Sequence, residues 1–233
     1  MFRIFIFFLL AFFSCQAFAQ DTLNVTDKTG RKQGVWRKKN SAGQLVYEGH
    51  FKDGLPLGEF RYYYPDGKLK TVSVISNQGK RAVTTSWFPN GKKMATGIYR
   101  DEKKDSTWQF FSESNGTLVS EENYKDGLTD GISKVFYPDG QLSEIHHLRS
   151  GVKDGPWEQY YLDGKIKLRA TYKAGEKDGL FKTFYSSGQV MMAGQYISGL
   201  QDGTWMYYGE MGAVTKKEIY NKGILVKLVG GAK

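Results

Sequence analysis

A repeat of 24 residues constrains this chain more than any other feature of its sequence. Its clearest copy runs from Gly155 to Gly164 and reads Gly-Pro-Trp-Glu-Gln-Tyr-Tyr-Leu-Asp-Gly. Aligned on their first residue, successive copies lie 24, 24, 24, 25, 24, 24 and 24 residues apart, at Gly34, Gly58, Ala82, Ser106, Gly131, Gly155, Gly179 and Gly203. A fixed period of this length is typical of repeat architectures, in which each unit buries apolar side chains against the next. Eight units therefore fill most of the 233 residues.

The residue pattern within a unit predicts a β-hairpin. Side chains alternate along an extended strand, so Trp157 points to one face and Tyr160 to the other. Turns such as Pro65-Asp66-Gly67 follow, in which proline presets φ and glycine supplies a positive φ. A second extended half ends at another glycine turn, such as Asp53-Gly54. We expect an all-β fold of tandem β-hairpin repeats that form one elongated, twisted antiparallel sheet, as 28 glycines and 15% aromatic residues also favour.

Residues 1–19 have the composition of a secretory signal peptide. Arg3 precedes an apolar run from Ile4 to Phe13, and Ala17-Phe18-Ala19 matches the small-residue cleavage signal. The apolar run is short for a membrane-spanning helix. We expect an exported protein, periplasmic, outer-membrane-associated or secreted after cleavage near Ala19. Acylation of Cys15, the single cysteine, is the less favoured alternative, and one cysteine excludes an internal disulfide.

The repeat and the leader together divide the chain. We predict a signal peptide (1–19), an N-terminal lead-in (20–33), eight hairpin repeats (34–227) and a C-terminal tail (228–233).

The net charge is +9, and the basic residues are scattered in small clusters between acidic turns. This distribution argues against a nucleic-acid-binding stripe. It is compatible with an anionic envelope surface or an acidic partner.

The units resemble MORN-type repeats, and more closely the MORN-variant repeats of bacterial proteins labelled YwqK-type antitoxins. The pattern is carried by Gly58 to Gly67 and by Gly179 to Gly188, and the resemblance covers residues 31 to 227. It implies an elongated antiparallel sheet that serves as a binding or scaffold surface; the antitoxin label implies neutralisation of a partner. Ala82 with Thr84, and Ser106, depart from the pattern, so we expect a bend or a specialised surface near residues 72 to 116.

Two rows of aromatic residues recur at fixed positions of the unit. We interpret the first as the hydrophobic spine of the sheet, formed by Trp36, Phe60, Trp108, Trp157, Phe181 and Trp205. The alternation places a second row on the opposite face, where it is a candidate contact surface for a sugar, a peptide or a protein. Its members are Tyr63, Trp87, Phe111, Phe136, Tyr160, Phe184 and Tyr208.

Other chemistry finds little support in the residues. The repeated Asp-Gly pairs supply one carboxylate per turn, whereas calcium needs about six converging oxygens. His146 and His147 are neighbours on a predicted strand and face opposite ways, which disfavours a shared metal. No nucleophile, phosphate-loop or zinc motif is present in the sequence. A glycoside hydrolase would need two carboxylates, such as Glu121 and Glu144, across one groove.

We therefore expect no catalytic residues, cofactor, metal or small-molecule substrate, and a protein-binding or envelope scaffold function. The alternative is an antitoxin or immunity protein that neutralises one toxin.

Overall fold

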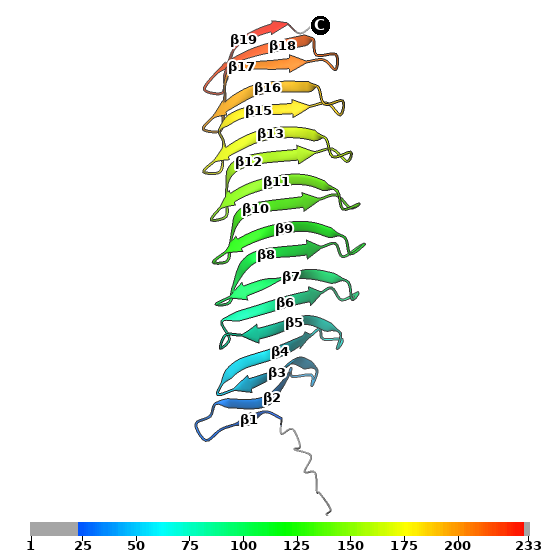
Figure 1. Ribbon diagram of the computed structural model, residues 1–233, viewed down its shortest axis with the longest axis vertical. Helices are drawn as coiled ribbons and strands as arrows, with labels where there is room; N and C mark the ends of the chain where they lie inside the picture. Colours follow the sequence, from blue (N-terminus) through cyan, green and yellow to red (C-terminus); the bar gives the residue numbers. More distant parts are fainter. Residues whose placement is uncertain (1–22, 231–233) are drawn as a thin grey trace, which may run out of the picture.

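The computed structural model describes residues 23–230 and shows an all-β protein built as one 19-stranded sheet. The described residues contain no helix, and hence none that is long and apolar enough to cross a membrane. Neighbouring strands are antiparallel and follow one another in chain order along one long axis, as Figure 1 shows. The strands are β1 (Val25–Thr26), β2 (Lys32–Lys39), β3 (Leu45–Lys52), β4 (Leu55–Tyr63), β5 (Leu69–Ser76), β6 (Arg81–Trp87), β7 (Lys93–Arg100), β8 (Lys103–Phe111), β9 (Leu118–Lys125), β10 (Leu128–Phe136), β11 (Leu142–Arg149), β12 (Val152–Tyr160), β13 (Ile166–Lys173), β14 (Glu176–Lys177), β15 (Gly179–Phe184), β16 (Val190–Ile197), β17 (Leu200–Tyr208), β18 (Val214–Asn221) and β19 (Ile224–Gly230).

The predicted fold class is confirmed. The hairpins β2–β3, β4–β5, β6–β7, β8–β9, β10–β11, β12–β13, β15–β16 and β17–β18 occupy the eight units. The predicted signal peptide and its cleavage site lie outside the described residues. At the other end, β19 runs to Gly230, so strand structure extends into residues 228–230, which we predicted to belong to the C-terminal tail.

The first turn of each hairpin has the expected chemistry. In the second unit the Gly67 amide donates to the Tyr64 carbonyl at 2.9 Å, and the Tyr64 amide donates to the Lys68 carbonyl at 2.8 Å. Gly67 has φ of 83°, which suits the residue without a Cβ. Asp66 accepts the Lys68 amide at 3.1 Å and so fixes the turn from inside.

The second turns join one hairpin to the next. Asp53 and Gly54 both have positive φ, 53° and 81°, as a tight two-residue hairpin turn requires. The Gly54 amide then donates to the carbonyl of Lys32 on the preceding hairpin at 2.9 Å. Each such turn therefore supports the unit before it.

The first residue of the unit marks a local irregularity of the sheet. Gly58, Gly155 and Gly179 have φ of 74°, 121° and 104°. Between β3 and β4 the pairing register shifts next to Gly58, which is a β-bulge. Ala82 stands at this position in the third unit, and the β5–β6 pairing runs without a register shift. The departure noted in the sequence therefore changes the sheet locally.

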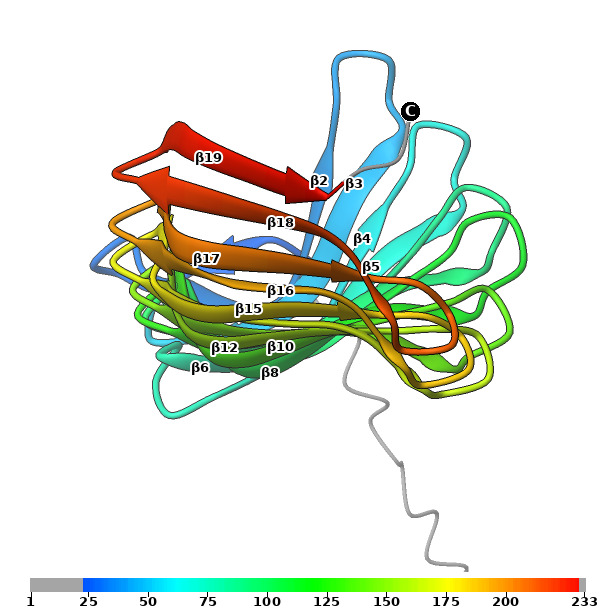
Figure 2. The same ribbon diagram turned by 90° about the horizontal axis from the view of Figure 1, so that it is seen from above.

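The sheet twists along its whole length. Seen from the end in Figure 2, β2 and β3 run at a steep angle to β17, β18 and β19. This accumulated rotation is the normal twist of stacked strands.

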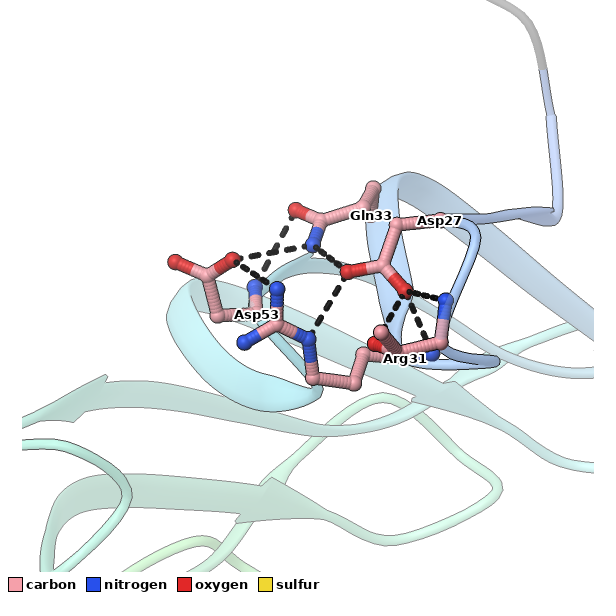
Figure 3. Close-up of polar contacts among 5 residues, drawn as sticks. Asp27, Arg31, Gln33 and Asp53 are labelled. Atoms are coloured by element: carbon pink, nitrogen blue, oxygen red, sulfur yellow. Dashed lines mark hydrogen bonds and ion pairs between the residues drawn. The ribbon is translucent and has the colours of Figure 1, made fainter.

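The N-terminal end is closed by a polar network (Figure 3). Asp27 accepts hydrogen bonds from Thr29 Oγ1 at 2.7 Å and Arg31 Nε at 2.8 Å. Gln33 Nε2 bridges Asp27 and Asp53, at 3.2 and 3.1 Å. The network ties the loop before β2 to the first inter-hairpin turn.

Candidate functional site

The two faces of the sheet differ in chemistry. One face, which we call the aromatic face, carries the spine residues, of which Phe60, Trp108 and Trp205 are 3%, 3% and 0% exposed. The opposite face carries cross-strand ion pairs, including Arg37 with Glu48 at 2.5 Å and Arg169 with Glu158 at 3.0 Å. On one face of this single-layer sheet aromatic rings pack against one another, and on the other face charged side chains form ion pairs.

Glycines on the neighbouring strand make room for the spine rings. A Cβ built on Gly49, Gly97 or Gly194 would lie 2.2 Å from the ring of Phe60, Trp108 or Trp205 respectively. Each glycine lies 11 residues before its aromatic partner, where the pairing register shifts between successive hairpins. The rings therefore lie flat on backbone, which explains how a single sheet buries a tryptophan completely.

The other units fill this pair of positions differently. Ala170 faces Phe181, and His146 faces Trp157 with the two rings parallel at 6.3 Å between centroids. In two units the aromatic residue is replaced by a hydroxyl residue: Thr84 faces Ser73, and Ser133 faces Glu122. The spine therefore has two gaps, and a cavity lies at each.

A row of lysines lies over the spine. The Nζ atom of Lys32 is 4.6 Å from the ring centroid of Trp36, that of Lys104 is 4.8 Å from Trp108, and that of Lys177 is 5.2 Å from Phe181. Lys153 lies 5.3 Å from Trp157 in the same way. These distances are those of cation–π contacts. Burial lowers the pKa of Lys104, although the nearby Glu122 acts in the opposite direction.

The first gap holds a cavity. It has a volume of about 470 Å³ and continues into a second cavity of about 300 Å³, which shares Tyr62, Ser73, Thr84 and Tyr99 with it. Its floor is formed by two hydroxyl pairs, Thr71 with Ser86 and Ser73 with Thr84, both at 2.9 Å. We call this continuous depression the hydroxyl groove. It overlaps residues 72 to 116, where the sequence predicted a bend or a specialised surface, and extends to β3 and β4.

The second gap is polar. Its cavity has a volume of about 330 Å³ and is lined by residues that include Glu122, Ser133, His146 and Lys153. Glu122 accepts hydrogen bonds from Ser120 at 3.1 Å and Tyr124 at 2.6 Å. Burial and this carboxylate together raise the pKa of Tyr124.

The second aromatic row predicted from the sequence does not gather at a cavity. All seven residues are half-buried, and of the cavities described only one of about 180 Å³ touches the row, at Phe136. Tyr160 donates to Glu158 at 2.6 Å, and burial together with this carboxylate raises its pKa to about 12. Four residues of the row also accept a hydrogen bond at their backbone carbonyl from a tyrosine hydroxyl. The pairs are Tyr64 to Trp87, Tyr137 to Tyr160, Tyr161 to Phe184 and Tyr185 to Tyr208. Its role as a contact surface stays a prediction.

The acid pair that a hydrolase would need is separated by the sheet. Glu121 faces Gln109 and Lys134 on the opposite face. Glu144 lies on the aromatic face, where it accepts from the Trp157 indole and contacts His146 Nε2 at 3.1 Å. His147 bonds the Pro156 carbonyl on the opposite face, so the two histidines diverge as predicted. Within residues 23–230 no group of three or more His, Cys, Asp or Glu side chains is placed to hold a metal ion.

Sequence reasoning missed the glycines under the rings and the lysines above them. Glycines inside strands are a known signal of close backbone approach, and Gly49, Gly97 and Gly194 each occupy the same place in their unit. Lys32, Lys104, Lys153 and Lys177 likewise recur at one position. Both the glycines and the lysines are visible in the sequence when the units are aligned at these two positions.

Comparison with solved structures gives matches of low global similarity. A mutant of TarM from S. aureus, in complex with fondaparinux, alpha-GlcNAc-glycerol and UDP, has 9% identity and a TM-score of 0.26, with 62% of this chain and 21% of that chain covered. TcdB2-TccC3 has 13% identity and a TM-score of 0.24, with 83% and 13% covered. The chain spans about a fifth or less of the length of these structures.

A search of curated proteins found no match, and no named relative tests the resemblance to YwqK-type antitoxins. The family model described as the MORN repeat variant matches residues 32–53, 56–73, 129–148, 153–174 and 177–198. The unmatched stretch between the second and third segments holds Ala82, Thr84 and Ser106, the residues that depart from the pattern. Five stretches of this sheet are therefore similar to MORN-variant repeats, and such repeats suggest a protein- or membrane-binding repeat module.

Proposed function

We propose that this chain is an exported, non-enzymatic module whose aromatic face binds an acidic surface of a protein partner. The observation that supports this most directly is the row of Lys32, Lys104, Lys153 and Lys177 over the spine rings. Among the described ion pairs none involves these four lysines. Their charges are therefore available to a partner.

The contrast between the faces favours the aromatic face as the contact surface. Ion pairs on the opposite face, such as Lys134 with Glu121 at 3.9 Å, already satisfy part of its charge. Aromatic and basic side chains are enriched at the energetic centres of protein interfaces. Complementary charge also speeds association with an acidic partner.

The scaffold role and the export rest on the sequence. The open, one-layer sheet of residues 23–230 offers a long surface, and the leader in residues 1–19 would carry it out of the cytoplasm. The non-enzymatic assignment rests on the lack of catalytic motifs noted in the sequence.

Capture experiments with the mature chain test the proposal. Envelope fractions are passed over immobilised wild type, over Lys104→Glu with Lys177→Glu, and over Tyr160→Ala with Phe184→Ala. We expect the lysine variant to lose the captured protein and the aromatic-row variant to keep it, with both variants shown by circular dichroism to be folded. The reverse result would move the interface to the row predicted from the sequence, and equal recovery by all three would remove the proposal.

Flotation with vesicles of anionic lipid separates a protein partner from a membrane surface. The proposal expects weak binding that disappears at physiological salt, because exposed charges are then screened. Retention of the chain on vesicles at that salt concentration would contradict a protein partner as the primary ligand.

The antitoxin alternative makes a different genetic prediction. A neighbouring toxin gene and lethality on deletion of this gene alone would support it. A viable deletion with envelope defects supports the scaffold.

A further inference from the structure

The hydroxyl groove has a specific structural cause. At the spine position of the third unit Thr84 replaces the aromatic residue, and its partner 11 residues earlier is Ser73 rather than glycine. The space that a ring occupies over Gly49 and over Gly97 is therefore open between them. The groove therefore forms where the spine ring of one unit is missing, and the units on both sides keep their rings, Phe60 and Trp108.

The walls of the groove are aromatic and held in place. On one side Tyr62 lies 6.0 Å from Tyr47 and 6.5 Å from Phe60, between ring centroids. On the other side Tyr99 packs edge-on against Trp108 at 4.9 Å. Because each wall ring is fixed by a neighbour, little ordering is needed when a ligand enters.

The floor is polar and retains hydrogen-bonding capacity. Each pair, Thr71 with Ser86 and Ser73 with Thr84, uses one hydrogen bond between its two hydroxyls. A hydroxyl can donate once and accept twice, so the four groups keep several free sites. An aliphatic ligand would cover these sites without satisfying them, which costs free energy.

Two lysines lie at the rim of the groove. Lys80 lines the larger cavity and Lys70 the smaller one. The ion pairs of the described residues include neither. Glu102 also lines the larger cavity, which leaves the rim with a net positive charge.

The geometry points to the hydroxyl groove as a binding site for an oligosaccharide that carries carboxylate groups. Sugar rings present apolar C–H faces, which suit Tyr62 and Tyr99, and hydroxyls at their edges, which suit the floor. The carboxylates would meet Lys70 and Lys80, in charge-assisted contacts. This site lies on β3 to β7 and does not depend on the protein partner proposed above.

The test uses the mature chain on an array of neutral and uronic-acid-containing oligosaccharides, followed by calorimetry with the best binder. We expect preferential binding of the acidic members, weakened by added salt. Binding of neutral members with equal affinity, or of none of the array, would overturn the assignment. So would binding of an acidic control peptide in their place.

A groove-filling variant makes the test site-specific. Thr84→Trp with Ser73→Gly recreates the ring-over-glycine pair of Trp108 and Gly97 and should abolish binding without lowering the melting temperature. A second variant, Thr71→Val with Ser86→Ala, keeps the walls and removes two hydroxyls; we expect binding about tenfold weaker. Lys222→Ala with Lys227→Ala, two exposed lysines at the C-terminal end of the sheet, is the control and should bind as wild type does. If one groove variant fails to fold, unchanged affinity in the other, folded variant would contradict the proposal.

Discussion

The burial of Trp205 depends on the absence of a Cβ atom at Gly194 on the neighbouring strand. The indole covers Gly194, and Phe181, Tyr196 and Tyr220 surround it with ring centroids at 5.6, 5.1 and 6.4 Å. Dispersion contacts of this density make aromatic residues the main source of apolar burial in a sheet that has no second layer. The glycine is therefore as much a part of the core as the tryptophan is.

Gly194→Ala should destabilise the protein. The new Cβ would lie 2.2 Å from the indole, so the ring must move off the strand. Overpacking of this kind costs about 1–3 kcal/mol. Urea unfolding followed by tryptophan fluorescence measures the change.

Gly209→Ala is the matched control, because its Cβ would meet its nearest neighbour, Thr215, at an ordinary 3.5 Å and no positive φ is involved. We expect a change within about 0.5 kcal/mol. Equal destabilisation by both substitutions would show that the indole contact is not the cause.

Glu218 gives the C-terminal end of the aromatic face a dependence on pH. Its carboxylate accepts from the Tyr207 hydroxyl at 2.6 Å, from Lys216 Nζ at 3.0 Å and from the Tyr220 hydroxyl at 3.1 Å. The Tyr207 hydrogen bond is the largest cause of its lowered pKa, with burial acting in the opposite direction. A lowered carboxyl pKa stabilises the fold above the ordinary value of 4.5, and this stabilisation is lost as the pH falls below it.

Glu218→Gln should reduce this acid sensitivity. We expect the variant to melt at a lower temperature than wild type at pH 7, and the difference to shrink at pH 3.5, since this pH lies below the ordinary value of 4.5 and the unfolded chain then binds the proton more readily than the folded one. Glu210→Gln, on an exposed turn, serves as the control. A constant difference at the two pH values would exclude Glu218 as the titrating group.

At the scale of the hairpin, a tyrosine ladder links successive units. Tyr64, Tyr137, Tyr161 and Tyr185 each donate to a carbonyl 23 residues further along the chain, at distances of 2.6 to 2.8 Å. Phe88 occupies the same place in the third unit and lacks the hydroxyl. The ladder is therefore interrupted at the unit that also carries the groove.

Tyr161→Phe should remove one rung and little else. The Phe184 carbonyl would lose its donor, at a cost of about 1 kcal/mol. The converse substitution, Phe88→Tyr, should add a rung to the Phe111 carbonyl and stabilise by a similar or smaller amount. Denaturant midpoints of the two variants measure both effects. An unchanged midpoint for Tyr161→Phe would contradict a stabilising rung, and a lower midpoint for Phe88→Tyr would mean that the hydroxyl is poorly tolerated in the third unit.

The hairpins were predictable because their determinants are local. Pro65, Asp66 and Gly67 are consecutive, and their turn closes through atoms within five residues. The spine row was also correct, since period-two alternation places Trp157 and Trp205 on one face. The cavity at Thr84 lies where the break in the repeat led us to expect a bend or a specialised surface.

The rest of the site depends on pairs that the sequence separates. Whether a ring at one position is buried depends on the residue 11 places earlier, as Gly97 and Ser73 illustrate. The groove likewise requires Tyr62 and Tyr99, which come from different hairpins. The alternation of side chains along a strand predicts which face a residue lies on, but it does not predict where a cavity forms. For this reason the sequence pointed to the row that contains Tyr160 and not to the groove.

At the scale of the whole molecule, the two ends of the described sheet differ. The N-terminal end has the Asp27 network, in which hydrogen bonds from Thr29 and Arg31 hold the Asp27 pKa below its ordinary range. At the other end β19 pairs only with β18 within the described residues. Ile224, Val226 and Leu228 on this strand are 70%, 58% and 56% exposed. In a repeat sheet, where each unit contacts its neighbours alone, such a difference affects the adjacent strands first.

Amide hydrogen exchange should therefore be graded along the sheet. We expect β19 and then β18 to exchange fastest, the central hairpins slowest, and β2 to be better protected than β19, because opening free energies are lowest where few contacts must break. Asp27→Ala removes the acceptor of the N-terminal network and should speed exchange in β1 and β2 while leaving β18 and β19 unchanged. Each hairpin of a repeat array contacts only its nearest neighbours. Loss of the N-terminal network can therefore destabilise the C-terminal strands only if every hairpin between them is also destabilised. Uniform acceleration along the chain in this variant would instead mean that the sheet opens as one cooperative unit, and the graded pattern would be wrong.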